Sequence, residues 1–199
     1  MEKSRHPLIL ASASAARQAV LRQAGLAFSA QPAELDEAAV KCGFEGTAQA
    51  LALTLARLKA AAVSACHPGA LVIGADQLLV SEGRYFDKPV GLAGAAAQLR
   101  ALRGRRHELV TAICVVQDGA TMWEHVAVPA LTMRAVSDGF IENYLAAEGE
   151  ALCHCVGAYR LEGLGVQLFA QIEGDYFTIL GLPLLALLDF LRRCGALAV

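Results

Sequence analysis

The chain has 199 residues, of which 56% are hydrophobic and 18% charged, so it is long and apolar enough to bury a sizeable core. Its formal net charge of −2, with both signs interspersed, argues against a protein that binds duplex nucleic acid, which needs a basic face. No segment reaches the roughly 18 uncharged apolar residues that cross a bilayer, and the scattered cysteines are typical of a reduced cytoplasmic protein. The composition still allows a small anionic ligand, because binding such a ligand needs only a local cluster of positive groups.

The first elements of the chain place an arginine where a helix dipole disfavours it. The apolar run Leu8–Ala11 predicts a buried strand, and Ala15–Ala24 predicts a helix after it. Arg17 falls in the first turn of that helix, where acidic residues are the stabilising choice. Ser12 and Ser14 are ordinary capping residues, and together with free backbone N–H groups and the arginine they describe a pocket for a phosphate. A plain serine-capped helix whose arginine points into water is the alternative.

The next part of the chain adds two acids and a lysine. The sequence ELDEA predicts a loop that carries Glu37, and a helix is predicted over about Ala48–Ala65. Lys59 lies at the border of that helix's apolar stripe, so it either extends to water or points into a cleft. The strand predicted over Ala70–Val80 would be fully apolar but for Asp76 and the glutamine after it. An unpaired buried carboxylate costs several kcal/mol, so Asp76 needs a cation, a metal ion or strong donors such as backbone N–H groups.

A second lysine follows a turn. SEGR predicts that turn, and Tyr85–Phe86 predicts a short partner strand. Lys88 stands directly before a proline, where the backbone is stiff and extended, which suits a lysine that must hold a fixed position. A plain turn is the alternative. Carboxylates can hold Mg²⁺ and cationic groups can hold a polyphosphate, so the residues above favour a nucleotide-like ligand.

The remaining segments continue to alternate between helices and strands. They are a helix over Ala93–Leu102, a hairpin of Glu108–Gln117 with Met122–Arg134, a helix from Ser137 to about Ala147, short strands after Tyr159, and a helix over Pro183–Arg193. This order predicts an α/β fold with a mixed sheet. The chain has neither a P-loop nor a GxGxxG after its first strand, which argues against a P-loop ATPase and a typical dinucleotide-binding protein.

Eight motifs follow one another along nearly the whole chain: LILASASAAR, LDE, LARLKA, VIGADQ, DKP, HELVTA, GAYRLEGLG and IEGDYFTILGLPL. In this order they resemble the motifs of the Maf proteins, which are nucleoside triphosphate pyrophosphatases. The resemblance implies one Maf-like domain over residues 1–199, with a mixed, twisted central sheet flanked by helices and two lobes around a cleft. It also implies hydrolysis between the α and β phosphates of a nucleoside triphosphate, with a divalent metal cation, Mg²⁺ or Mn²⁺.

Carried over by position, the resemblance implies a role for each residue singled out above. Asp76 is the proton acceptor and, with Glu37, a metal ligand. The phosphate-handling groups are Ser12, Arg17, Lys59 and Lys88. The implied partner is a small nucleotide substrate, with no duplex nucleic acid and no membrane. The resemblance also suggests a homodimer.

Three positions bear on which base is preferred. Gln77 stands where the dTTP/UTP branch of the family has threonine and Glu162 where it has glutamine, so the chain resembles the branch that hydrolyses 7-methyl-GTP. A methylated guanine carries positive charge and N–H donors, which the carboxylate of Glu162 can accept, although an exposed loop residue without such a role is the alternative. Ala16 stands where that branch typically has a tryptophan, so this position cannot stack on a base.

Two other functions compete with a 7-methyl-GTP pyrophosphatase. One is a dTTP/UTP pyrophosphatase of the same family, and the other is a non-catalytic nucleotide-binding regulator of cell division. A pure binding protein has no need for a buried base beside a metal-binding acid, so Asp76 and Glu37 favour an enzyme.

Overall fold

The computed structural model describes residues 6–198 as a mixed α/β fold, in which helices flank a central mixed sheet. The chain divides into two compact units. The first unit comprises Met1–Gln77, Thr111–Ala127 and Asp175–Val199, and the second comprises Leu78–Val110 and Val128–Gly174. The expected two lobes correspond to these units, while the cleft and the description of the chain as one domain stay predictions.

In the first unit, parallel strands are followed by an antiparallel hairpin. β1 (Leu8–Leu10) pairs in parallel with β2 (Ser29–Ala30) and with the first part of β3 (Leu71–Ser81). β5 (Arg106–Gln117) neighbours β3, and the second part of β5 pairs antiparallel with β6 (Ala120–Ala127). All of β1 and nearly all of β3 are buried, as their unbroken apolar runs predict.

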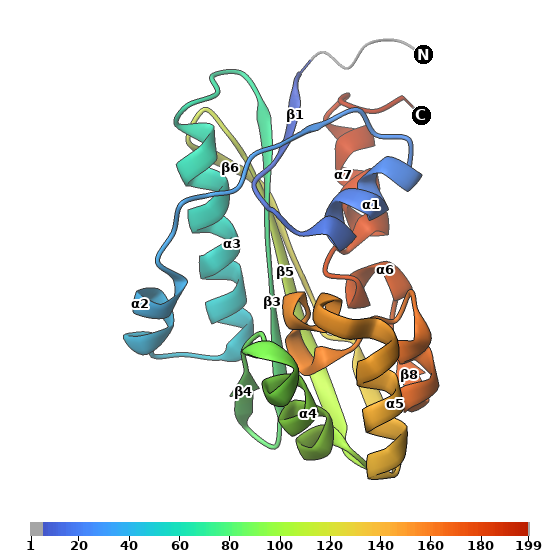
Figure 1. Cartoon of the computed structure of the whole chain (residues 1–199). Coiled ribbons are helices and arrows are strands. Elements are labelled where there is room, and N and C mark those ends of the chain that lie inside the picture. The colour runs from blue at the N-terminus through green and yellow to red at the C-terminus, as the bar shows by residue number, and fades with distance from the viewer. Residues whose placement is uncertain (1–5, 199) are drawn as a thin grey trace. The chain divides into compact units, whose positions relative to one another are not determined.

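Helices cover both sides of these strands. They are α1 (Ala15–Gln23), α2 (Glu37–Cys42), α3 (Ala48–Ser64), α6 (Tyr176–Ile179) and α7 (Leu184–Arg193). In Figure 1, α3 runs along one side of the strands, and α1 and α7 lie on the other. Leu71, Ile73 and Ala75 of β3 belong to the same apolar core as the buried residues of α1 and α7. Because side chains alternate along a strand, the even-numbered residues of β3 face α3.

One glycine of β3 allows α3 to pack unusually close. A Cβ added to Gly74 would lie 2.1 Å from the carbonyl oxygen of Ala56 and 2.8 Å from the backbone nitrogen of Ala60. The backbone of α3 therefore rests directly on β3, with no side chain between them. This contact keeps the neighbouring turn of α3 within reach of the next even-numbered residue of the strand.

The second unit is built from antiparallel strands. β4 (Arg84–Phe86) pairs with the end of β3, and β7 (Ala130–Met133) pairs with the start of β5 and with β8 (Phe169–Glu173). Its helical segments are α4 (Gly91–Leu102), α5 (Asp138–Glu148) and the 3₁₀ segments η1 (Gly149–His154), η2 (Val156–Ala158) and η3 (Leu164–Leu168). Across residues 6–198, no helix combines the length and the apolar character that crossing a membrane requires.

The boundaries of most predicted helices and strands are confirmed to within two residues. For two segments, however, the predicted type of secondary structure was wrong. The ELDEA segment is not only a loop: Asp36 accepts a hydrogen bond from the Ala39 backbone N–H at 3.0 Å and caps α2, whose first residue is Glu37. After Tyr159, the expected run of short strands is instead η3, the single strand β8 and the short helix α6. Both errors concern segments too short for a clear hydrophobic period.

The strand expected over Met122–Arg134 is interrupted. It divides into β6 and β7 at Val128 and Pro129, although the pairing with β5 keeps the same register on both sides of the break. Proline has no N–H to donate to the ladder, which accounts for the interruption. The hairpin itself is confirmed, with Asp118 and Gly119 both at positive φ in its turn.

Candidate functional site

Asp76 is a buried carboxylate on the face of β3 that meets α3. The residue is 5% exposed, and its Oδ1 accepts a hydrogen bond from Lys59 Nζ of α3 at 2.6 Å. The lysine side chain is itself 12% exposed, so it does not extend into water. The close packing of α3 on Gly74 explains how a lysine near the border of the helix's apolar stripe reaches this strand.

Lys59 also contacts the second acid. Its Nζ lies 2.8 Å from Oε1 of Glu37, the first residue of α2. A carboxylate is well placed there, because a helix N-terminus carries partial positive charge. One ammonium group therefore joins two carboxylates from different elements, and the three side chains together carry one net negative charge.

Among residues 6–198, two buried side-chain polar atoms have no hydrogen-bond partner: the second carboxylate oxygen of Asp76 and Nδ1 of His107. Oδ2 is fully buried and has no hydrogen-bond partner in the described structure. Buried polar atoms are almost always paired, because an unpaired one costs free energy of unfolding. Unpaired atoms of this kind occur at sites that need a ligand or a proton, which favours a functional role for Asp76.

Arg17 is built into the first unit and does not point into water. Its Nε donates to the carbonyl oxygen of Gly181 at 2.8 Å, and its Nη1 donates to the carbonyl oxygen of Ala75 at 3.0 Å and to Ser12 Oγ at 3.3 Å. Ser14 Oγ accepts from the backbone N–H of Arg17, as expected of the capping residue of α1. Burial lowers the pKa of the guanidinium, and the negative charges of Asp76 and Glu37 act in the opposite direction.

Gln77 lies on the opposite face of β3 from Asp76. Its amide nitrogen donates to Thr111 Oγ1 at 2.9 Å and to the carbonyl oxygens of Thr178 and Ile179 at 3.1 and 3.2 Å. These contacts tie β3 to β5 and to α6. The amide nitrogen of Gln77 is therefore occupied by the protein, and its part in base specificity stays a prediction.

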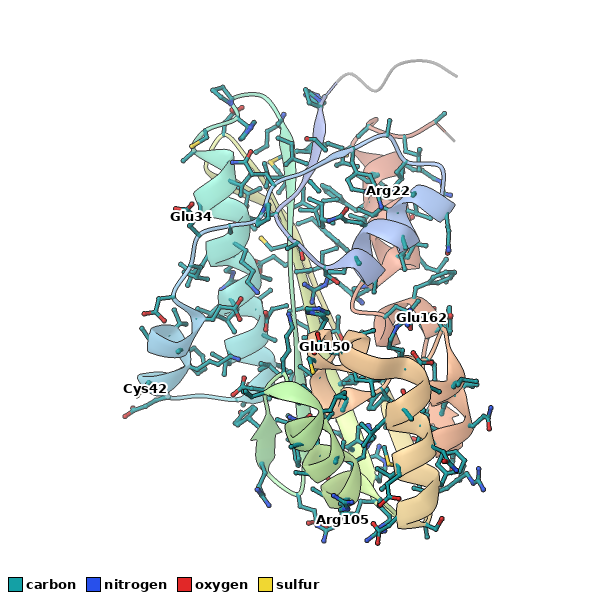
Figure 2. The ribbon with its side chains drawn as sticks, in the orientation of Figure 1. Arg22, Glu34, Cys42, Arg105, Glu150 and Glu162 are labelled. Carbon is teal, nitrogen blue, oxygen red and sulfur yellow. The ribbon has the colours of Figure 1, made fainter. Side chains whose placement is uncertain are left out.

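Lys88 and Glu162 belong to the second unit, so their placement relative to Asp76 stays a prediction. Lys88 is exposed after β4, in a segment whose Asp87 carbonyl oxygen accepts from Gln98 Nε2 at 2.7 Å. Glu162, labelled in Figure 2, lies just before η3, and its Oε1 is 3.3 Å from Arg160 Nε. Ala16 lies in the first turn of α1, in the first unit.

The residues that the resemblance assigns to a divalent cation fit that role. Carboxylate oxygens are the hard donors that Mg²⁺ and Mn²⁺ prefer, and Mg²⁺ is often held by one or two carboxylates together with substrate phosphates and waters. Asp76 and Glu37 both contact the ammonium group of Lys59, so the two carboxylates lie close to one another. Within residues 6–198, no group of three or more His, Cys, Asp or Glu side chains could hold a metal alone. The donor set suits a cation that shares the phosphates of a substrate.

Two further polar groups of the second unit escaped the sequence analysis. Glu148 is the last residue of α5, and only 8% of its side chain is exposed. His107 of β5 is 1% exposed, and its Nε2 lies 2.9 Å from the hydroxyl of Tyr159. Burial, with a smaller contribution from the charge of Arg106, lowers the pKa of His107 to about 4, so the ring is neutral at neutral pH. An acid at the C-terminus of a predicted helix was the available signal for Glu148, because the helix dipole disfavours it there.

Comparisons with known proteins agree with these observations. The family of Maf-like proteins matches residues 7–194 of this chain. The chain is 53% identical over 192 residues to a nucleoside triphosphate pyrophosphatase of Paramagnetospirillum magneticum, across 95% of this chain and 99% of that protein. It is 51% identical over 193 residues to a 7-methyl-GTP pyrophosphatase of Rhizobium etli, across 96% of this chain and 97% of that protein.

A solved structure of a nucleoside-triphosphatase (dITP/XTP pyrophosphatase) from Mycobacterium abscessus is a more distant likeness. It covers 95% of this chain and 94% of that one, at 16% identity and a TM-score of 0.41, which is too low to carry an argument. The family match extends over nearly all of the described residues, and the relatives share about half of their residues with this chain over almost their full length. The chain therefore belongs to the Maf family.

Proposed function

We propose that this chain is a nucleoside triphosphate pyrophosphatase, which converts a nucleoside triphosphate and water into the monophosphate and pyrophosphate. The observation that carries the proposal is the buried carboxylate of Asp76: one oxygen accepts from Lys59, and the other has no hydrogen-bond partner in the part of the chain that the structure describes. A base that must take a proton needs such an available oxygen, held in place by its neighbour. Relatives with the name nucleoside triphosphate pyrophosphatase support the same activity.

In this proposal, Asp76 takes the proton of the attacking water at Oδ2. The water oxygen bonds to the α phosphorus, the bond from that phosphorus to the bridging oxygen breaks, and pyrophosphate leaves with the electron pair. Lys59 holds Oδ1 and so fixes the orientation of the carboxylate. Glu37 and Asp76 would hold a cation such as Mg²⁺, which would neutralise negative charge on the phosphates.

The remaining cationic groups would bind the phosphates. Arg17 supplies a fixed positive charge, because two carbonyl oxygens and Ser12 Oγ hold its guanidinium in one position. Lys88 is exposed and available to an anionic ligand. A panel of nucleoside triphosphates, with detection of released pyrophosphate, tests the activity. A pure protein that releases none, or that releases only orthophosphate, contradicts the proposal.

We further propose 7-methyl-GTP, or a related modified nucleotide, as the preferred substrate. Gln77 and Glu162 both differ from the dTTP/UTP branch, and a relative with the name 7-methyl-GTP pyrophosphatase is 51% identical to this chain. A carboxylate at position 162 can accept N–H bonds from a cationic guanine, which a pyrimidine cannot match. We also expect a homodimer, as the resemblance suggests, and a cytoplasmic location, as the scattered cysteines indicate.

Substitution of Glu162 tests the base preference. Glu162→Gln should narrow the difference in kcat/KM between 7-methyl-GTP and UTP by about ten- to a hundredfold, because one charge-assisted contact contributes roughly 1.5–3 kcal/mol. Competition among 7-methyl-GTP, GTP, dTTP and UTP measures this on the wild type and the variant. A wild type that prefers dTTP or UTP would contradict the proposed base while leaving the pyrophosphatase activity intact.

A further inference from the structure

The segment that carries Glu162 is held by a carboxylate from α5. Glu148 Oε1 accepts the backbone N–H of Leu164 at 2.8 Å, and its Oε2 accepts Nη1 of Arg160 at 3.0 Å. One side chain therefore binds both ends of the turn formed by residues 160–164. Only 8% of the Glu148 side chain is exposed, so the carboxylate itself is largely removed from water and depends on these two donors.

Other features of the second unit fit this contact. A Cβ on Gly163 would lie 2.6 Å from Glu148 Oε1, so the lack of a side chain there allows the carboxylate to approach the backbone. Tyr144, one turn earlier on α5, accepts the backbone N–H of Arg160 through its hydroxyl at 3.2 Å. The helix dipole disfavours an acid at the end of α5, and Arg160 compensates that cost. The turn is thus fixed by two side chains on one face of α5.

Arg160 is shared between two acids. Its Nη1 is 3.0 Å from Glu148, and its Nε is 3.3 Å from Glu162, whose side chain is 33% exposed. The buried contact with Glu148 is the shorter one. The three side chains carry one net negative charge, and the more exposed acid of the two is Glu162.

We propose that Glu148 is a positioning residue for base selection: it fixes the 160–164 turn and shares Arg160 with Glu162, so that the charge of Glu162 is only partly compensated and its carboxylate remains available to a cationic purine. This inference rests on the proposed function, since it takes Glu162 as the group that meets the base. Without the charge of Glu148, Arg160 has a single acid to pair with and neutralises Glu162. A nucleotide with a cationic base then binds less tightly, because the negative charge that attracted it is compensated, whereas the binding of a nucleotide with a neutral base changes little.

The test compares two nucleotides that differ by one methyl group and its charge. In Glu148→Gln, the ratio of kcat/KM for 7-methyl-GTP to that for GTP should fall about tenfold, through KM, because one charge-assisted contact is weakened. The same change in the Glu162→Gln background should cause no further fall, because the group that Glu148 frees is already absent. Glu150→Gln is the matched control: Glu150, also labelled in Figure 2, is exposed and lies two residues further along.

The outcomes separate this inference from the proposed function. A wild type without preference for 7-methyl-GTP contradicts both the proposed base preference and this inference, and leaves the pyrophosphatase activity intact. A wild-type preference that Glu148→Gln leaves unchanged, an equal loss for both nucleotides, or a fall that persists in the Glu162→Gln background contradicts the inference alone.

Hydrogen exchange tests the anchoring without any substrate. Glu148→Ala removes the acceptor of the Leu164 amide, so that amide should exchange about tenfold faster, whereas Glu148→Gln keeps an acceptor oxygen and should stay near the wild-type rate. An unchanged rate in Glu148→Ala would overturn the assignment of Glu148 as the anchor of the turn.

Discussion

Asp76 binds Lys59 through one carboxylate oxygen, and its other oxygen is buried without a hydrogen-bond partner among residues 6–198. For stability alone, a polar atom without a partner is unfavourable, and a second donor or an apolar residue would serve better. A reacting group has the opposite need, because an oxygen without a donor has both of its lone pairs available for a proton. Lys59 meets both needs at once, since it compensates the charge of Asp76 and leaves Oδ2 open.

Asp76→Asn should lower kcat by at least about a hundredfold, because an amide cannot accept the proton that a carboxylate does. The substitution keeps the shape of the side chain, so urea unfolding should show that the variant remains folded. Steady-state pyrophosphate release measures the rate. The control is Asp189→Asn, which alters a carboxylate with 66% exposure and should leave kcat unchanged. A folded Asp76→Asn variant with near wild-type activity would mean that the aspartate is structural.

His107 links the start of β5 to the residue that follows η2, through the hydroxyl of Tyr159. Because burial lowers its pKa to about 4, the folded protein keeps the ring neutral at pH values where the unfolded chain, with a pKa near 6.5, binds a proton. The neutral ring of His107 therefore contributes fully to the stability of the folded state above about pH 6.5, and this contribution is lost progressively as the pH falls toward 4.

Between pH 7.5 and pH 4.5, this histidine should reduce the free energy of unfolding by about 2–3 kcal/mol. His107→Gln keeps a polar partner for Tyr159 but does not titrate. The free energy of unfolding of this variant should therefore fall by about 2–3 kcal/mol less than that of the wild type over the same pH range. Urea unfolding of both proteins at the two pH values measures the difference. Equal pH dependence in the two proteins would show that another group causes the decline.

At the scale of elements, α3 and β3 are joined by backbone contact at Gly74. Because a Cβ there would lie 2.1 Å from the Ala56 carbonyl oxygen, Gly74→Ala must push the helix from the strand. We expect a loss of about 2–4 kcal/mol in the free energy of unfolding, in the range of overpacked cores and strained backbone. The shift should also move Lys59 away from Asp76 and lower kcat.

Gly139→Ala is a suitable control for that substitution. Gly139 lies in α5, and a Cβ there would meet only Ser137 Oγ at 4.0 Å, so alanine should leave stability unchanged or raise it slightly. Thermal unfolding and pyrophosphate release on the two variants separate a local packing effect from a general one. If Gly74→Ala is as stable as the control, the close approach of α3 does not matter for folding.

At the scale of the whole molecule, the residues assigned to substrate belong to two compact units that share β3 and β5. The proposed base, both proposed metal ligands, Lys59 and Arg17 all lie in the first unit. Lys88, Glu162 and the carboxylate that anchors its turn lie in the second. Of the three positions proposed to bear on the choice of base, Ala16 and Gln77 lie in the first unit and Glu162 lies in the second, so both units carry residues proposed for base selection.

Removal of divalent cations should abolish turnover, because two carboxylates facing a polyphosphate need a cation to neutralise their charge. After exhaustive EDTA treatment, pyrophosphate release should stop and should return when Mg²⁺ or Mn²⁺ is added in excess. Circular dichroism before and after treatment checks that the fold persists without the cation. Turnover that continues in EDTA would contradict the assignment of Glu37 and Asp76 as metal ligands.

Local patterns were sufficient to predict most of the elements from the sequence. The buried runs of β1 and β3, and the helices capped by Ser14, Thr47 and Ser137, depend on residues close together in the chain. Local patterns also identified Asp76 and Lys59 as candidate site residues, because each is a charged residue within or beside the apolar pattern of its own strand or helix. The interruption of the strand at Pro129 had a local signal too, which the alternating pattern around it outweighed.

Only the tertiary structure decided which of these groups meet. The pairing of Lys59 with both Asp76 and Glu37 depends on how closely α3 packs on Gly74, and the pairing of Glu148 with Arg160 joins the end of α5 to a turn twelve residues later. Such contacts are set by packing between elements distant in the chain, which no local period encodes. The sequence alone therefore determined the elements and the reactive residue types, and packing determined that one carboxylate oxygen of Asp76 is left unpaired.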